Sequence, residues 1–352
     1  MSEGGLQCPL PLRQYPNVLL AHGGGGQLSR DLLHHLFLPQ FENPLLAPLH
    51  DGAVVEIEGR SLAFSTDSYV VSPLFFPGGD IGRLAVNGTV NDLAMCGAKP
   101  LYLSCGFILE EGLKMEDLQR VILSCGEAAK EAEVLLVTGD TKVVEKGKGD
   151  SLFLNTSGIG LVERPLLPKM VKPGDAIIVS GTIGDHGIAI MSVREGLEFE
   201  SEMKSDTASL YPLVAKLLDS CQQLHCLRDP TRGGIASALN EIAGAAGVGM
   251  VLEETAIPVR PEVQGACEIL GLDPLYVANE GKLVAFVAKE ESDKALEALR
   301  SHPLGKDAAV IGEVATGQEA RSCPTGTVVM HTAVGGERIV EMMSGEQLPR
   351  IC

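Results

Sequence analysis

Four aspartates stand at the predicted edges of strands and helices, where a carboxylate can reach a bound ion. Asp51 lies in a His-Asp-Gly-Ala segment, Asp67 follows a strand, Asp92 lies in a mostly apolar helix, and Asp229 begins Asp-Pro-Thr-Arg-Gly-Gly. A single aspartate of this kind is usually a turn or cap residue. An unpaired carboxylate inside an apolar helix is costly, however, and clusters of oxygen ligands suit Mg²⁺ shared with substrate phosphates. The set predicts a Mg²⁺ site at Asp51, Asp67, Asp92 and Asp229.

A run of glycines near the start of the chain is a candidate phosphate contact. Gly23, Gly24, Gly25 and Gly26 follow His22 and lead into a predicted helix. Consecutive glycines let backbone N–H groups converge on an anion, and the start of a helix adds its dipole. A plain flexible loop is the alternative. The sequence has no GxxxxGK[ST] motif, which excludes a P-loop nucleotide site.

Two further motifs follow or precede predicted strands. A strand over 134–137 runs into Thr138-Gly139-Asp140-Thr141-Lys142, which is a plausible phosphate contact or a surface turn with a solvated lysine. Asn279-Glu280-Gly281-Lys282 stands just before a strand over 283–287. Glu280 at a strand edge is a candidate general base, and a hairpin residue is its alternative interpretation.

The elements that must position these residues mix hairpin-like strands with helices. The first half is predicted to contain strands at 53–57, 61–66, 134–137, 152–154 and 157–161, and helices at about 29–37, 80–95 and 114–132. The second half is predicted to contain helices at about 207–219, 233–246, 262–270 and 292–301, and strands at 176–179, 283–287, 309–314 and 328–331. A proline-rich boundary is predicted near 163–172. This order favours an α+β protein over a doubly wound sheet.

Composition excludes several classes of function. A net charge of −18 argues against a nucleic-acid partner, which normally needs a basic face. No apolar stretch of about 18 residues predicts a membrane span, and residues 1–16 lack the pattern of a signal peptide. The nine cysteines are scattered and odd in number, which indicates reduced thiols and a cytoplasmic protein.

The chain ends in a polar tail, 335–352, that is predicted to be flexible and closes with Pro349-Arg350-Ile351-Cys352. At roughly 3.3 Å per extended residue, such a tail can carry one thiol over some tens of ångströms. A free thiol with a pKa of about 8.5 supplies some thiolate at neutral pH and accepts acyl groups. Cys352 is therefore a candidate carrier of a reacting group, although a frayed chain end is the alternative.

In combination, these motifs resemble the ATP-binding superfamily of aminoimidazole ribonucleotide synthetase and selenophosphate synthetase. The motifs are Ser65-Thr66-Asp67-Ser68, the segment from Gly82 to Ala98, Gly139-Asp140-Thr141-Lys142, Asp229-Pro230-Thr231-Arg232-Gly233-Gly234 and Asn279-Glu280-Gly281. Within that superfamily, the glycine run, the segment 68–82 and the terminal Pro-Arg-Ile-Cys resemble the HypE family of hydrogenase maturation factors. The resemblance covers about residues 17–352.

The resemblance implies a leader at 1–16, an N-terminal ATP-binding and dimerisation domain at 17–165, a C-terminal domain at 166–334 and the tail at 335–352. It also implies a homodimer that binds ATP and Mg²⁺, with Asp51, Asp67, Asp92 and Asp229 as metal ligands. The residues that it assigns to ATP are Gly23, Gly24, Gly25, Gly26, Asp67, Asn91, Asp140 and Thr141. Its catalytic candidates are Cys352, Glu280, Lys142 and, as a second choice for the base, His186.

The reaction implied by the resemblance is the ATP-dependent dehydration of a carbamoyl group on Cys352. HypF is the implied donor of that group, and a HypC–HypD complex is the implied acceptor of the resulting cyanide for NiFe hydrogenase iron. Two alternatives remain. One is a superfamily enzyme that acts on a free small molecule, such as selenophosphate synthetase or thiamine monophosphate kinase, although Cys8 lacks the expected Gly-rich, Lys-containing context. The other is a carrier without catalysis, which needs no nucleotide site.

Overall fold

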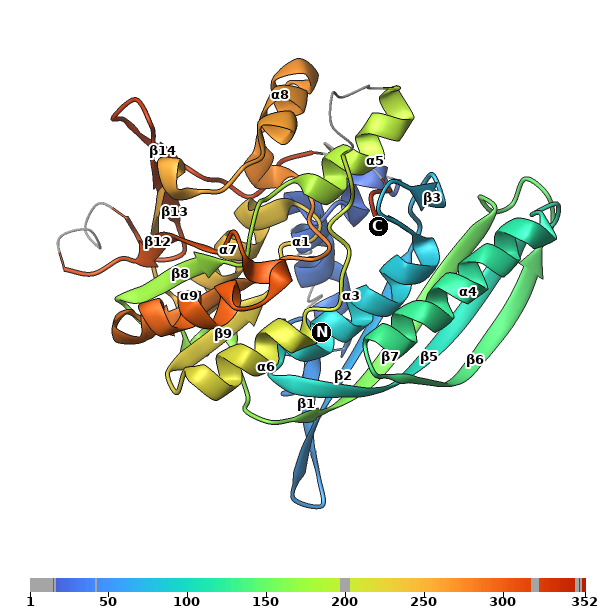
Figure 1. Cartoon of the computed structure of the whole chain (residues 1–352), viewed down its shortest axis with the longest axis horizontal. Coiled ribbons are helices and arrows are strands. Elements are labelled where there is room, and N and C mark those ends of the chain that lie inside the picture. Colours follow the sequence, from blue (N-terminus) through green and yellow to red (C-terminus); the bar gives the residue numbers. More distant parts are fainter. Residues whose placement is uncertain are drawn as a thin grey trace, which may run out of the picture.

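Two mixed sheets, each packed against helices, make up the molecule (Figure 1). The structure is a computed structural model that describes residues 15, 17–41, 43–196, 203–317, 323–345, 348 and 350–352. The α+β class expected from the order of elements is confirmed.

The first sheet has five strands in the order β1-β2-β7-β5-β6. Its strands are β1 (Ala53–Ile57), β2 (Arg60–Tyr69), β5 (Ala98–Glu110), β6 (Leu135–Val144) and β7 (Leu152–Val162). Neighbouring strands are antiparallel except β5 and β6, which are parallel. Burial alternates along β2 and β7, as expected for strands with one face on the core.

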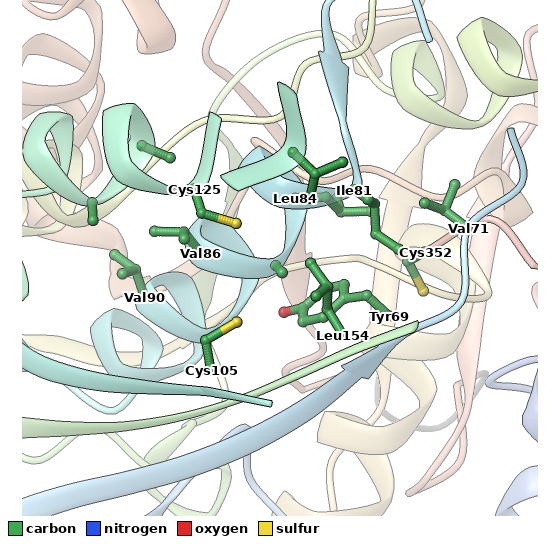
Figure 2. Close-up of a cluster of buried hydrophobic side chains, with 14 of the residues drawn as sticks. Tyr69, Val71, Ile81, Leu84, Val86, Val90, Cys105, Cys125, Leu154 and Cys352 are labelled. Carbon is green, nitrogen blue, oxygen red and sulfur yellow. The ribbon is translucent and has the colours of Figure 1, made fainter. Parts of the chain in front are cut away.

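Two helices, α3 (Ile81–Met95) and α4 (Met115–Glu131), cover one face of this sheet (Figure 1). Asp80 caps α3 by accepting hydrogen bonds from the N–H groups of Gly82 at 2.7 Å and Arg83 at 3.1 Å. Almost every residue of α3 is buried, whereas α4 buries only one face. Figure 2 shows the resulting core, in which helix side chains pack on the strands.

The second sheet has seven strands in the order β14-β13-β10-β12-β8-β11-β9. Its strands are β8 (Asp175–Val179), β9 (Leu224–Arg228), β10 (Met250–Glu253), β11 (Val284–Ala288), β12 (Ala309–Val314), β13 (Val328–His331) and β14 (Glu337–Ile339). Strands β8 and β11 are buried throughout, because both faces are covered. One face packs on α7 (Gly234–Ala246), and the other on α6 (Tyr211–Ser220) and α9 (Ser292–Arg300).

The remaining helices lie outside these layers. They are α1 (Gln27–Leu32), α2 (Leu38–Phe41), α5 (Asp185–Glu195) and α8 (Pro261–Leu270), and a small hairpin joins β3 (Phe75–Phe76) to β4 (Gly79–Asp80). Among the described residues, no helix combines the length and apolar character that a membrane span needs.

Helix α3 joins the two halves through Asn91. Its side-chain NH₂ donates to the carbonyls of Ala208 at 3.0 Å and Glu280 at 3.3 Å, and its Oδ1 accepts from the N–H of Leu210 at 2.8 Å. Asn91 is 1% exposed, so these bonds are shielded from water. They fix the segment that carries Glu280 against the helix that carries Asp92.

Several elements differ from the sequence predictions. Strand β6 continues to Val144, so Thr138 to Lys142 lie inside a strand rather than after it. The two strands predicted over 152–161 are one, β7. Several elements were not predicted at all: strands β3, β4, β5, β9, β10 and β14 and helices α2 and α5.

The end of the chain is packed against the protein. Ile351 is 3% and Cys352 is 7% exposed, and both belong to the first core. Figure 2 shows Cys352 at its edge, near Val71. Figure 1 shows the C-terminus beside β3 and α5. The first part of the predicted tail, 335–352, belongs to the second sheet, because β14 pairs with β13 and Val340 is buried. The flexibility predicted for the rest of the tail stays a prediction, since the structure describes one position of its end.

Candidate active site

A polar cavity of about 200 Å³ lies where the two halves meet. Its lining comes from the loop before β1, from β2 and α3, from the segments that follow β9 and precede β11, and from the end of the chain. The residues that line it are His50, Asp51, Thr66, Asp67, Gly88, Asp92, Arg228, Asp229, Thr231, Arg232, Glu280 and Cys352. It therefore collects all four predicted metal ligands, the predicted base and the predicted carrier.

Three of the aspartates form a compact carboxylate cluster. One oxygen each from Asp51, Asp92 and Asp229 lie within 4.8 Å of one another. Burial, together with the neighbouring carboxylates, raises the pKa of Asp92 and Asp229 well above the usual range and that of Asp51 to about 7. Like charges this close repel one another, so the cluster is electrostatically favourable only with a positive charge among them.

Hydrogen bonds orient two members of the cluster. The Ser65 hydroxyl donates to Asp92 Oδ2 at 2.6 Å and lies 2.9 Å from the carbonyl oxygen of Asp51. Arg228 Nε pairs with Asp51 Oδ1 at 2.9 Å, and the same guanidinium holds Glu241. Arg228 also partly offsets the charge of Asp229, but its direct ion pairs are with Asp51 and Glu241.

The cluster fits Mg²⁺. Asp51 Oδ2 is buried and accepts no hydrogen bond, although its partner oxygen pairs with Arg228. An all-oxygen donor set of three carboxylates is the kind that Mg²⁺ prefers. Asp67 lines the same cavity but lies outside the close cluster, so its predicted role as a metal ligand has less geometric support.

Glu280 faces the cavity from the segment before β11. It is 3% exposed, and its Oε1 is buried without a hydrogen-bond partner. Burial first, and then the carboxylates of Asp229, Asp67 and Asp206, raise the pKa of Glu280 well above its usual range. A carboxylate with a raised pKa is a stronger base once its proton has left.

The backbone around Glu280 is fixed by one aspartate. Asp206 accepts from the N–H of Glu280 at 3.1 Å and from Lys282 Nζ at 3.0 Å. A side chain at Gly281 would bring its Cβ to 1.7 Å from the carbonyl oxygen of Asp206, so only glycine fits there. The backbone on both sides of Glu280 is therefore held in place, by the hydrogen bond to its own N–H and by the close packing at Gly281.

Cys352 and Arg232 line the same cavity and interact electrostatically. Burial raises the pKa of the Cys352 thiol; Glu280 and Asp67 raise it further, and Arg232 opposes them. A docked thiol is therefore protonated at neutral pH and is a poor nucleophile.

Several predicted site residues lie outside the cavity lining. Asp140, Thr141 and Lys142 are on β6, at the edge of the first sheet and separated from β2 by β7 and β5. Lys142 forms an ion pair with Asp140 there, and both are exposed. Within one chain, the structure does not bring this motif together with the aspartates.

The glycine run lies near the cavity through Arg232. Arg232 NH1 is 3.4 Å from the carbonyl oxygen of Gly23, and a Cβ at Gly25 would lie 2.7 Å from Cβ of Arg232. The N–H of Gly25 donates to Ser29 Oγ at 3.0 Å. The role of the loop in phosphate binding stays a prediction.

His186 is fully buried and does not line the cavity. Its Nε2 lies 2.8 Å from the carbonyl oxygen of Ile351, and its Nδ1 lies 2.8 Å from Ser205 Oγ. Both ring nitrogens are thus engaged, which favours Glu280 over His186 as the base. His186 contacts the tail instead.

Sequence reasoning missed three cationic or ionisable members of the lining: His50, Arg228 and Arg232. Arg232 stands inside the Asp-Pro-Thr-Arg-Gly-Gly motif, which is the signal that identifies it. Burial, with help from Arg228, lowers the pKa of His50 to about 4, so it is neutral. Arg228 precedes Asp229 at the end of β9, and nothing in the sequence pairs it with the distant Asp51.

Comparison with known proteins identifies the family. Family models described as AIR synthase related protein match this chain, the N-terminal domain at 49–162 and the C-terminal domain at 172–322. Carbamoyl dehydratase HypE of Cupriavidus necator is 53% identical over 351 residues, covering 99% of this chain and 98% of that protein. The chain belongs to the HypE family. This agrees with the resemblance found in the motifs.

Two solved HypE structures have the same fold. One, HypE in complex with ATP, is 53% identical with a TM-score of 0.81, covering 96% of this chain and 100% of that one. The other, a HypE–HypF complex, is 47% identical with a TM-score of 0.83, covering 89% of this chain and 99% of that one. HypE relatives at this identity favour a dehydratase over a kinase of the wider superfamily.

Proposed function

We propose that this protein uses ATP to dehydrate a carbamoyl group carried on Cys352, leaving a thiocyanate. The observation that carries the proposal is that the Cys352 side chain shares one cavity with the carboxylate cluster and Glu280. The carboxylate cluster would serve phosphoryl transfer and Glu280 would serve as the base, and both line the cavity that holds the thiol. The ATP complex of the HypE relative supports the choice of nucleotide.

The proposed reaction balances as two steps on the group –S–C(=O)–NH₂. The amide oxygen attacks the γ-phosphorus of ATP, and the bond to the β-phosphate oxygen breaks to release ADP. The nitrogen then loses its two protons, one to Glu280 and one to solvent, and the C–O bond breaks, so that phosphate leaves with the oxygen. The product is –S–C≡N, and the carbon changes no oxidation state.

Each wall of the cavity has a proposed role. Asp51, Asp92 and Asp229 would hold Mg²⁺, which supplies neutralisation of phosphate charge when bound. Arg232, which lines the same cavity as Cys352 and interacts with it electrostatically, would stabilise negative charge that develops on the bound group. Glu280 accepts an N–H proton, because its buried carboxylate reaches the cavity from the side of the thiol.

The test of the function is mass spectrometry of the C-terminal peptide. The full chain would be incubated with a HypF carbamoyltransferase, carbamoyl phosphate and ATP. We expect Cys352 to gain one carbamoyl group and then to lose one water only when ATP and Mg²⁺ are present. A carbamoylated peptide that keeps its water under all conditions would contradict the proposal.

Glu280→Gln separates loading from dehydration. Glutamine keeps the size of the side chain but accepts no proton, so we expect normal ATP binding and carbamoyl loading with thiocyanate formation slowed at least about 100-fold. The same peptide assay measures both steps. Glu268→Gln, on α8, is the matched control and should react as the natural chain does. Thiocyanate formed at the natural rate by the Glu280 variant would require another base.

Loading is proposed to need an undocked tail. The docked thiol is buried and its pKa is raised, so it is a poor acceptor where the structure places it. The HypE–HypF complex of a relative supports HypF as the donor, and a HypC–HypD complex is the proposed recipient of cyanide for the hydrogenase iron. We place these events in the cytoplasm. We assign ATP binding to 17–165 and the second domain to 166–334. Within the tail, 335–352, strand β14 anchors the start in the second sheet, and the part after β14 is the proposed carrier.

The chain is proposed to work as a homodimer through the first sheet. The face opposite α3 and α4 carries exposed apolar side chains on neighbouring strands, including Phe64, Tyr102, Ile108, Ile159 and Leu161. Exposed apolar side chains gathered on neighbouring strands in this way are typical of an interaction surface. Lys142 shares this face, since it is in register with Ile108, and pairing of two copies would bring it to the interface.

Sedimentation tests this dimer. At micromolar concentration we expect about twice the 37.1 kDa of one chain. Ile159→Asp places a charge at the centre of the apolar face and should shift the protein to a monomer. Val193→Asp replaces an exposed valine on α5 and is the matched control, which should remain dimeric. A natural chain that sediments as a fully active monomer would contradict the proposal.

A further inference from the structure

The last three residues are held mainly through their backbone. The main-chain oxygens of Arg350, Ile351 and Cys352 each accept a hydrogen bond from a residue far away in the sequence. The donors are Ser72 N–H at 3.3 Å to Arg350, His186 Nε2 at 2.8 Å to Ile351 and Val70 N–H at 3.0 Å to Cys352. Arg194 adds a second bond to the carbonyl of Arg350. Recognition of this kind resembles the addition of an extended peptide to a protein surface.

His186 is built for this contact. A carbonyl oxygen only accepts, so Nε2 carries the proton and Nδ1 accepts the hydroxyl proton of Ser205. The ring is fully buried, and Phe76 packs edge-on at 5.6 Å between centroids. Removing the ring would leave the Ile351 carbonyl buried without a donor, which is costly.

Side chains add selectivity for a basic, then an apolar, then a thiol residue. Arg350 Nε donates to the carbonyl of Val70 at 2.9 Å, and its guanidinium pairs with Asp150. Ile351 is 3% exposed within the first core, and Cys352 follows it into the cavity. Val70, Ser72, Asp150, His186 and Arg194 are called the tail-binding surface below.

We propose that the tail-binding surface is a peptide site that also works in trans, on a separate peptide or a second copy's tail ending in Arg-Ile-Cys. This inference rests on the proposed function. The contacts described above reach the last three residues from other parts of the chain, so the covalent link mainly raises the local concentration of the tail. Short flexible links give effective concentrations in roughly the millimolar range, which a free peptide can match.

Binding is tested with a full-length acceptor chain whose own tail is displaced. Ile351→Asp with Cys352→Ser puts a carboxylate into an apolar core, which disfavours docking of that tail. The probe is a synthetic Leu-Pro-Arg-Ile-Cys peptide with a fluorescent N-terminus, followed by anisotropy. We expect saturable binding to the acceptor chain and binding at least about tenfold weaker to the natural chain, whose own tail competes.

The contribution of His186 distinguishes this site from adventitious binding. His186→Ala in the acceptor chain should weaken peptide binding about tenfold, and His186→Gln, which keeps a donor, should restore part of it. Thermal unfolding checks that each variant is folded. A peptide with the last three residues in reverse order is the control. No saturation up to millimolar peptide, or equal binding by the folded His186→Ala chain, would overturn the proposal.

Turnover is tested with the S-carbamoyl form of the same peptide and ATP. We expect thiocyanate peptide to form on the acceptor chain, with KM raised about tenfold by His186→Ala and kcat within about twofold, because His186 binds rather than reacts. If the peptide binds without reacting while the natural carbamoylated chain reacts, action in trans is wrong and the proposed function stands. If the natural chain also fails, the proposed function itself is wrong.

Discussion

Cys352→Ala should abolish carbamoyl loading and thiocyanate formation while leaving the protein folded. The substitution removes one sulfur at the edge of the first core, a side chain that is 7% exposed (Figure 2). Loss of such a small buried group costs about 1 kcal/mol, which a domain of this size tolerates. The hydrogen bond from Val70 N–H to the main-chain oxygen of Cys352 does not involve the thiol and remains. Loading is measured by mass spectrometry and folding by thermal unfolding.

Cys125→Ala is the matched control for this loss. Cys125 lies in the same core cluster and is 3% exposed but does not line the cavity, so its replacement removes the same atom from the core without touching the site (Figure 2). We expect a similar fall in stability with loading and dehydration unchanged. ATP binding should persist in both variants, because neither touches the carboxylate cluster. A Cys352→Ala chain that is still carbamoylated and dehydrated would sink the central proposal.

The sequence predicted which residues line the cavity better than it predicted the contacts that hold them in place. Asp51, Asp92, Asp229 and Glu280 were each singled out by their motifs, and the structure brings them into one cavity. Motifs carry this information because each is a short segment whose turn or cap presents one side chain. The partners that orient them, such as Arg228 on Asp51, come from distant segments and have no local signature.

Strand β5 and helix α5 are two of the elements that the sequence did not predict, and each was missed for a physical reason. Strand β5 carries Pro100 and Gly106, which interrupt the alternation that identifies a strand. Helix α5 begins after Gly184, with a φ of +82°, and contains Gly187, where a Cβ would lie 2.4 Å from Val277. Only glycine fits at position 187 because of this close packing, but a glycine in a sequence usually indicates a loop.

The position of the tail was beyond sequence reasoning. The length of the tail predicted how far the Cys352 thiol can travel. That distance alone does not identify the surface on which the tail docks. The destination depends on backbone donors at Val70 and Ser72 and on His186, whose sequence context suggested a base. Main-chain recognition leaves little trace in the sequence of either partner, because any residue type supplies the same N–H and carbonyl groups.

Asp92→Asn should reduce ATP turnover by at least about 100-fold in a protein that is no less stable than the natural one. Asparagine keeps an oxygen for the Ser65 hydroxyl, which now bonds Asp92 Oδ2 at 2.6 Å. Burial and then the carboxylates of Asp229 and Asp51 raise the pKa of Asp92. Its ionisation therefore opposes folding, increasingly as pH rises from the pKa of the unfolded chain, and asparagine removes that penalty.

Magnesium separates this explanation from simple damage to the fold. With the natural chain, added Mg²⁺ should raise the unfolding temperature, since the cation relieves repulsion within the cluster and binds only the folded state. The Asp92→Asn chain should lose most of that rise and should start from an equal or higher temperature without Mg²⁺. Asp219→Asn, at an exposed position of α6, is the control and should behave as the natural chain does. Normal ATP turnover by the folded Asp92→Asn chain would show that the cluster does not hold the catalytic cation.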